Sequence, residues 1–368
     1  MTRAGGPGGG VRAAADRADS LLHVWLERPL VAAMRARWRS EYGLVLVALG
    51  AGLVGWWHIT TPRKYPDFTV LWAAATHAFG PVYDQRWLTG LQHAPGERPF
   101  SYPPTFLLLL IPIGWLKFRI AYVGWMAASV AGFVAVARRW SAWGWLAVWS
   151  PTLMFAALIG QTTLLVGAAA GLALAEAERR PIVAGVALGL AGCIKPQLVY
   201  LLGPALMLWR AWAALGWAAA TAALLAAAAA AVFGPTIWGS WLASLAGFVA
   251  VQDRAAIDRL GLWAVSPWLA VAAGVVVAVM LARAARARDR AALAIVALGG
   301  GLLLSPHAVF YDSAVLLIPA LAMIGWNWRA AVVATLLVIG AETSWAVAAV
   351  TLLLGQPRTP LASTADAA

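Results

Sequence analysis

Charged side chains are scarce in this chain of 368 residues: only 11% are Asp, Glu, Lys or Arg, whereas 62% are hydrophobic. A soluble domain normally carries about 25% charged residues. Long runs such as 213–233 and 331–354 lack the polar face of a surface helix, and they are long enough to cross about 30 Å of hydrocarbon. Apolar residues run continuously rather than alternating, which argues against a β-barrel. The composition therefore predicts an all-α polytopic membrane protein.

Cysteine is almost absent. Cys193 is the only one, which excludes disulfides within the chain and Cys-rich metal sites. The net charge is +12, but the Lys and Arg residues fall in short connections between apolar segments. That is the pattern of membrane-orientation signals, so we expect no nucleic-acid partner. Residues 1–20 lack the apolar core of a cleavable signal peptide.

The domain organisation follows from where the polar residues lie. Residues 1–40 are rich in Arg and predict a cytoplasmic tail followed by a helix on the membrane surface. Residues 41–355 predict one transmembrane domain, interrupted by two long polar connections at 61–102 and 234–262. Residues 356–368 predict a disordered tail.

Twelve apolar segments are candidates for membrane crossing. They are 43–60, 103–117, 119–137, 142–159, 162–177, 181–194, 196–209, 212–233, 263–282, 291–304, 313–326 and 330–354. If all of them crossed, Lys and Arg would divide equally between the two sides, against the positive-inside tendency. If one segment between 103 and 159 fails to cross, the inside connections carry about twice as many as the outside ones. We therefore expect about eleven (10–12) transmembrane helices, with both long connections, Gln161, Lys195 and His307 on the outer side.

Asp67 is the first candidate for chemistry. It lies in the sequence Tyr65-Pro66-Asp67-Phe68, directly after the first apolar segment. A carboxylate at the edge of a bilayer is costly and commonly functional. Asp67 could cap the helix that follows Pro66, or it could act as a general base at the membrane–water boundary.

Four further polar islands interrupt the apolar segments. Gln161 could bind a sugar hydroxyl or phosphate, or satisfy carbonyls at a helix end. Lys195 could bind a phosphate or extend to the interface. His307 in Ser305-Pro306-His307 could donate to a phosphate oxygen, with Tyr311 and Asp312 beside it, or be a satisfied buried histidine. Tyr102, in Ser101-Tyr102-Pro103-Pro104, belongs to a rigid turn that begins an apolar helix.

No metal or cofactor is demanded by the sequence. It has no Walker A loop and no HExxH motif. Asp84 lies close to Asp67 in sequence, which leaves a divalent metal open, but no ligand cluster calls for one. A carboxylate, an amide, an ammonium and an imidazole on one face fit an acid–base reaction on a lipid phosphate.

The ordered motifs resemble those of glycosyltransferase family 87 (DUF2029) over roughly residues 43–330. The matching motifs are Pro66-Asp67-Phe68, Val82-Tyr83-Asp84, Phe100-Ser101-Tyr102-Pro103-Pro104 leading into Leu107–Pro112, Gly160-Gln161, Ala184-Gly185 with Gly189 and Lys195-Pro196, and Ser305-Pro306-His307. One departure is Thr162, where the family often has an Asn after the Gln.

This resemblance implies a GT-C fold in the inner membrane of a bacterium. It also implies sugar transfer, commonly of mannose and in some relatives of arabinofuranose, from a polyprenyl-phosphate donor at the periplasmic face. The partners would be that donor, a lipid or glycan acceptor, and membrane lipids. By this resemblance Asp67 corresponds to the first-loop Asp that serves such enzymes as base.

The resulting hypothesis is an inverting transfer in which Asp67 deprotonates the acceptor hydroxyl. We expect Lys195 and His307 to bind the donor phosphate. Sugar or acceptor contacts are expected from Gln161, Tyr102, Asp84, Tyr311 and Asp312. A transporter or lipid flippase using the same polar islands is the alternative, although no internal repeat is evident. A structural membrane subunit is a third possibility.

Overall fold

The computed structural model describes residues 49–51, 53–54, 56–57, 67–92, 98–254, 260–323 and 344–357. The chain divides into two units, Met1–Leu46 and Val47–Ala368, and the first lies wholly outside the described residues. The predictions for the N-terminal tail, for most of segment 43–60 and for residues 358–368 therefore also fall outside them.

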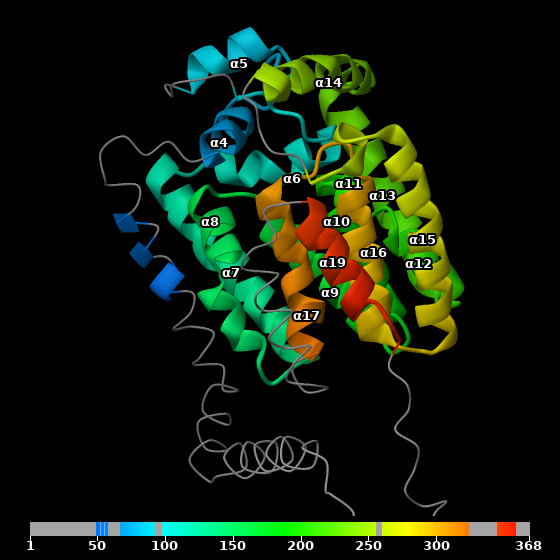
Figure 1. The fold of residues 1–368 in the computed structure, drawn as a ribbon. Coiled ribbons are helices and arrows are strands. Elements are labelled where there is room, and N and C mark those ends of the chain that lie inside the picture. Colours follow the sequence, from blue (N-terminus) through cyan, green and yellow to red (C-terminus); the bar gives the residue numbers. More distant parts are fainter. Residues whose placement is uncertain are drawn as a thin grey trace, which may run out of the picture. The chain divides into compact units, whose positions relative to one another are not determined.

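All regular elements of the described part are helices (Figure 1). In chain order they are α4 (Phe68–Thr76), α5 (Gln85–Leu91), α6 (Pro104–Gly114), α7 (Phe118–Trp140), η1 (Gly144–Trp149), α8 (Pro151–Leu158), α9 (Thr163–Glu176), α10 (Pro181–Ile194), α11 (Pro196–Val199), α12 (Leu202–Leu208), α13 (Trp212–Phe233), α14 (Ile237–Arg254), η2 (Leu262–Ala264), α15 (Pro267–Arg286), α16 (Arg290–Leu304), η3 (Phe310–Leu316), α17 (Leu317–Ala322) and α19 (Ser344–Leu354).

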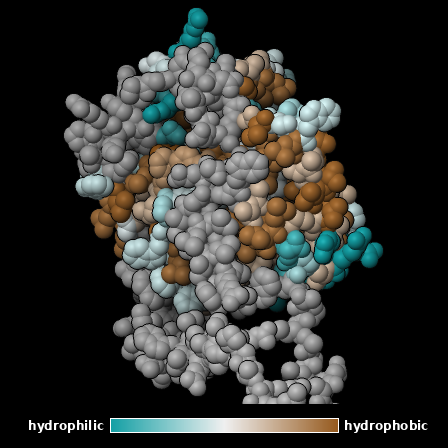
Figure 2. Space-filling model, viewed as in Figure 1, coloured by the Kyte–Doolittle hydropathy of each residue, from teal (hydrophilic) through white to brown (hydrophobic). Residues whose placement is uncertain are grey.

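Three described helices, α7, α13 and α15, are long and apolar enough to cross a membrane. Their outward faces keep large apolar side chains exposed, among them Leu224 of α13 and Val275 of α15. Apolar residues also gather in a band across the face seen in Figure 2, with hydrophilic residues above it and near the lower end of α15. An apolar surface of this extent suits a bilayer rather than water. The prediction of an all-helical membrane protein is confirmed.

Helix α6 is too short to span a membrane. Its 11 residues measure about 16 Å at 1.5 Å per residue. Just after α6, the Leu116 carbonyl accepts a hydrogen bond from Trp72 Nε1 of α4 at 3.0 Å. The Phe118 ring, at the start of α7, lies 5.9 Å from that of Phe68. Helix α7 thus begins beside Asp67 and leads away from it, and α6 is shorter than the hydrocarbon core is thick.

The long connections are themselves partly helical. The first contains α4 and α5, and the second contains α14. Figure 1 shows these three helices together at one end of the bundle. The Ser101 carbonyl accepts a hydrogen bond from Trp241 Nε1 of α14 at 3.0 Å, which joins the second connection to the end of the first.

Arginine is concentrated at the opposite helix ends. Arg139 pairs with Glu176 at 2.8 Å, and Arg288 pairs with Glu178 at 3.4 Å, so the ends of α7 and α9 meet the turn between α15 and α16. The nine arginines of these ends and turns are Arg138, Arg139, Arg179, Arg180, Arg210, Arg283, Arg286, Arg288 and Arg290.

Close packing of α10 on α13 depends on two glycines four residues apart, Gly185 and Gly189. A Cβ atom at Gly185 would collide with the Trp217 Cβ and the Ala214 carbonyl, and one at Gly189 would lie 2.7 Å from the Thr221 Cβ. Residues at this spacing share one helix face. In a bilayer no hydrophobic effect pushes two helices together. Small residues at the contact let the helices approach closely, so that van der Waals packing stabilises the pair.

Gly185→Val should lower the melting temperature of the detergent-solubilised protein by several degrees, because the added methyl groups force α10 and α13 apart. Gly192→Val on the same helix is the matched control, since no atom lies within 4 Å of its added Cβ. Equal melting temperatures for the two variants, measured by scanning fluorimetry, would contradict this account of the packing.

Candidate active site

The turn between α8 and α9 brings Asp67 to the centre of the site. Gly160 has φ +72°, a left-handed conformation that glycine adopts without steric cost. A Cβ there would lie 2.5 Å from the Phe68 Cβ. The missing side chain lets α4 approach so closely that the Phe68 N–H donates to the Ile159 carbonyl at 2.9 Å. Asp67 therefore lies against Gln161.

Asp67 occupies the N-cap position of α4, but its side chain makes no capping hydrogen bond. Its Oδ2 instead accepts from Gln161 Nε2 at 2.8 Å, and its Oδ1 lies 3.6 Å from Arg98 Nε. The side chain remains 38% exposed. The helix-cap interpretation is therefore wrong. A carboxylate has about four lone-pair sites, so this one can still accept another proton or hydrogen bond.

Lys195 marks the break between α10 and α11. Pro196 disfavours a helical conformation for Lys195, whose φ and ψ are −135° and 79°. The ammonium has three acceptors: Asp312 Oδ1 at 2.8 Å, Thr163 Oγ1 at 3.1 Å and Gln161 Oε1 at 3.4 Å. Its side chain is only 9% exposed, so the alternative that it extends to the interface is wrong.

Asp312 is the counter-ion of this lysine and is itself 2% exposed. Its Oδ1 also accepts from Thr163 Oγ1 at 2.5 Å, and its Oδ2 accepts from the Val309 N–H at 3.2 Å. The Tyr311 ring centroid lies 5.4 Å from Lys195 Nζ, which adds a cation–π contact. The carboxylate thereby connects η3 to the start of α9 and to the break after α10.

Tyr102 completes the network. Its hydroxyl donates to Gln161 Oε1 at 3.3 Å and accepts from Thr162 Oγ1 at 3.3 Å. Its carbonyl accepts from the Tyr83 hydroxyl at 3.0 Å, which anchors the loop before α6. Desolvation raises the pKa of the Tyr102 hydroxyl, so it is a protonated donor at neutral pH.

Two predicted site residues make their described side-chain contacts outside this hydrogen-bond network. Asp84 is exposed and caps α5, with Oδ1 accepting from the N–H groups of Arg86 and Trp87 at 2.9 and 3.1 Å. His307 is half-buried, and its ring centroid lies 5.5 Å from that of Phe248 in α14. The sugar or acceptor role of Asp84 and the phosphate role of His307 stay predictions. Among the residues that the structure describes, no group of three His, Cys, Asp or Glu could hold a metal ion.

Sequence reasoning missed Arg98 and Thr163. Arg98 is positioned by Thr69, whose Oγ1 accepts from Nη1 at 3.3 Å, and it is the cation nearest to Asp67 in the described contacts. Nothing in the sequence distinguishes it from other basic loop residues. Thr163 directly follows the Gly160-Gln161 motif, so its closeness to Gln161 was available as a signal.

The fold and the network define a helical membrane protein with a hydrogen-bonded charged centre. The comparison with protein families identifies the particular class: Glycosyltransferase family 87 matches residues 100–306, more than half of the chain, and the chain belongs to this family. It is therefore a membrane glycosyltransferase, which acts on a sugar donor and an acceptor. Searches of curated proteins and of solved structures gave no match.

Lys195→Met should destabilise the protein by about 3–5 kcal/mol, because it leaves the Asp312 carboxylate buried without its counter-ion. Lys195→Met/Asp312→Asn should recover much of that loss, since the amide keeps an oxygen for the Val309 N–H without a buried charge. The measurement is unfolding in detergent. Lys117→Met, at an exposed position, serves as the control and should unfold like the wild type. A double variant no more stable than Lys195→Met would argue against the ion pair as the cause.

Proposed function

We propose that the protein transfers a sugar, mannose in the first instance, from a polyprenyl-phosphate donor to a lipid or glycan acceptor. The proposed setting is a GT-C fold in the bacterial inner membrane, with the site facing the periplasm. The observation that carries the proposal is the state of Asp67. This carboxylate is held by Gln161 and Arg98, makes no cap, and stays partly exposed at the edge of an otherwise buried polar network.

In the proposed reaction Asp67 accepts the proton of the acceptor hydroxyl, whose oxygen attacks the anomeric carbon. The bond from that carbon to the phosphate oxygen breaks, polyprenyl phosphate leaves, and the configuration inverts. Gln161 fixes one carboxylate oxygen and Arg98 faces the other, so the base is oriented before substrate binds. The Tyr102 hydroxyl orients Gln161, and in this proposal it also contacts the sugar.

The arginine distribution supports the proposed orientation. Nine arginines lie at the helix ends away from Asp67, and positive residues favour the cytoplasmic side. Because α6 is shorter than the hydrocarbon core is thick, the proposal assigns Lys117 and Arg119, at the start of α7, to the site's side. This arrangement agrees with a chain of about eleven spans, which stays a prediction.

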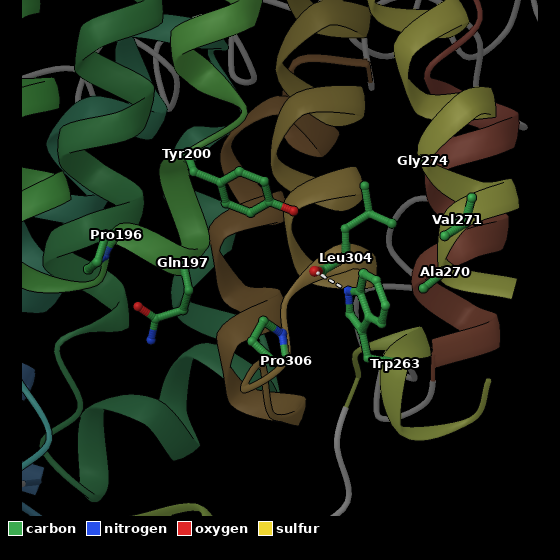
Figure 3. Close-up of a pocket in the computed structure, with 9 residues that line it drawn as sticks. All are labelled: Pro196, Gln197, Tyr200, Trp263, Ala270, Val271, Gly274, Leu304 and Pro306. Atoms are coloured by element: carbon green, nitrogen blue, oxygen red, sulfur yellow. Dashed lines mark hydrogen bonds between the residues drawn. The ribbon is translucent and has the colours of Figure 1, made fainter. Parts of the chain in front are cut away.

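A groove beside the site is suited to the lipid part of the donor. It has a volume of about 560 Å³ and is lined mainly by apolar atoms of α11, α15 and the end of α16. Figure 3 shows Gln197 and Tyr200 on one side of it and Trp263, Ala270 and Val271 on the other. The Trp263 Nε1 donates to the Leu304 carbonyl at 2.9 Å, so the indole N–H is satisfied and its ring is left as apolar wall.

The donor phosphate is expected at the mouth of this groove. Pro196 and Pro306 line the groove, and they are the chain neighbours of Lys195 and His307. The Lys195 ammonium already has three acceptors, of which Gln161 is the most distant. A phosphate oxygen would therefore take the place of Gln161 on Lys195, while His307 donates from the rim.

The direct test is incubation of the purified protein with a panel of radiolabelled polyprenyl-phosphate sugars and membrane lipid extract. We expect label to move from one donor, polyprenyl-phosphate mannose, to an extractable acceptor. Transport of intact donor across a vesicle membrane without any transfer product would instead support the flippase alternative.

Asp67→Asn should reduce transfer by roughly 10²–10⁴-fold, the usual cost of losing a general base. The fold should survive, because the amide can still accept from Gln161. Asp84→Asn makes the same chemical change in the same connection and should cost far less activity, since Asn caps a helix as well as Asp does and its amide can still hydrogen-bond a sugar hydroxyl. Full activity in Asp67→Asn would rule out the base, and equal losses in both variants would show that Asp84 shares the role.

Gly274→Leu should raise the KM for a long-chain donor about tenfold or more, equivalent to losing about 1.4 kcal/mol of binding, with little change in kcat. The new side chain fills the groove, and its Cβ meets Leu304 at an ordinary 3.8 Å. Gly216→Leu, on the exposed face of α13 with no atom within 4 Å, is the control. A donor with a prenyl chain too short to reach Gly274 should be used equally by both. Identical KM values for the long-chain donor would exclude this groove.

A further inference from the structure

A second cleft lies at the end of the bundle away from Asp67. It has a volume of about 530 Å³, and we call it the arginine cleft after its lining. Helix α9 leads to it from Thr163 in the site, and α16 leads from it back towards Ser305. The residues that define the cleft are Arg139, Trp140, Glu178, Trp209, Arg288 and Arg290.

Positive charge exceeds negative charge in the arginine cleft. Glu178 is shared between Arg288 at 3.4 Å and Arg290 at 3.6 Å, so one carboxylate faces two guanidinium groups. Arg139 contributes a third, paired at 2.8 Å with Glu176. The three arginine side chains are 37–57% exposed, and a guanidinium has five donors, so each can still bind a further anion.

Arg288 lies just after α15 and ends it in a Schellman motif, in which the Asp289 N–H donates to the Ala284 carbonyl at 3.1 Å. The φ of Arg288 is +52°, in the left-handed region that a residue with a Cβ seldom occupies. Its guanidinium lies 5.2 Å from the Trp209 ring centroid, and its Nη1 donates to the Trp209 carbonyl at 3.2 Å. These contacts fix the Arg288 side chain at the end of α12, on the side of the cleft that Trp209 lines.

The surroundings indicate what kind of anion fits. Trp140 and Trp209 are at helix ends, where indole rings favour the level of lipid headgroups. Helix α15 ends just before Arg288, and about two to four turns further from the cleft it exposes Val275, Val276 and Val279, an apolar surface for acyl chains. A ligand that contacts both the arginines and the exposed valines has a negative headgroup and hydrocarbon tails.

We propose that the arginine cleft binds the phosphodiester headgroup of an anionic phospholipid, at a site separate from that of the sugar donor. Arginine recognises phosphate oxygens through paired N–H donors, and basic pockets between membrane helices suit acidic headgroups. The bound lipid would fasten the ends of α7, α9, α12 and α16 to one another. This proposal does not depend on the proposed transfer reaction.

The test uses the full chain and native mass spectrometry in detergent, with phosphatidylglycerol and phosphatidylcholine as probes. We expect phosphatidylglycerol to bind at least tenfold more tightly than phosphatidylcholine, which carries the same phosphodiester without net charge. Arg288→Gln/Arg290→Gln should weaken phosphatidylglycerol binding roughly 10- to 30-fold. Equal affinity for the two lipids would overturn the proposal.

Arg283→Gln/Arg286→Gln is the matched control. It removes the same charge from the same helix ends, at exposed positions that do not line the cleft. We expect wild-type lipid binding in this variant, and an equal loss in both pairs would show diffuse attraction instead of a site. sn-Glycerol 3-phosphate at millimolar concentration should not displace the lipid. If it does, the ligand is a soluble phosphate and the lipid assignment is wrong.

Discussion

The ion pair between Lys195 and Asp312 is the interaction on which the centre of this protein depends. An ammonium and a carboxylate, 9% and 2% exposed, meet at 2.8 Å within a helical membrane domain. Separating them would leave an uncompensated charge where water cannot solvate it. The break between α10 and α11, which carries Lys195, and η3, which carries Asp312, must therefore stay together. Thr163, between the two charges, adds the start of α9 to this junction.

Asp67 depends on that junction indirectly. Gln161 has one amide with two tasks: its oxygen accepts from Lys195 and its nitrogen donates to Asp67. A carboxylate needs a donor and an ammonium needs an acceptor, so only this orientation of the amide satisfies both. The buried pair therefore sets the direction of Gln161, and Gln161 sets the direction of the carboxylate. This explains why a residue at the N-cap position of α4 is not used as a cap. Such an arrangement agrees with the proposed role of Asp67 as a base that is aligned before the donor arrives.

Much of the helical architecture was predictable, because helices are interrupted at residues whose own backbone chemistry disfavours a continuous helix. Pro196 and Gly160 end or turn helices by their backbone properties alone, and the observed ends of α7, α9, α10, α13 and α16 fall within a few residues of the expected segments. The charge pattern predicts that one segment between 103 and 159 fails to cross, and this stays a prediction; the short α6 beside α4 makes 103–117 the candidate. The Lys195–Asp312 pair, 117 positions apart, was not predictable, because tertiary packing alone brings it together. The same holds for Arg98 and Asp67.

The claim that Asp67 is a base, and not a nucleophile that first forms a bond to the sugar, is tested most directly by stereochemistry. A single displacement inverts the anomeric centre, whereas a covalent intermediate would retain it by two displacements. The measurement is the one-bond C1–H1 coupling of the transferred sugar in donor and product, by NMR on ¹³C-labelled donor. The account predicts opposite anomeric configurations in the two. The same configuration in donor and product would contradict it.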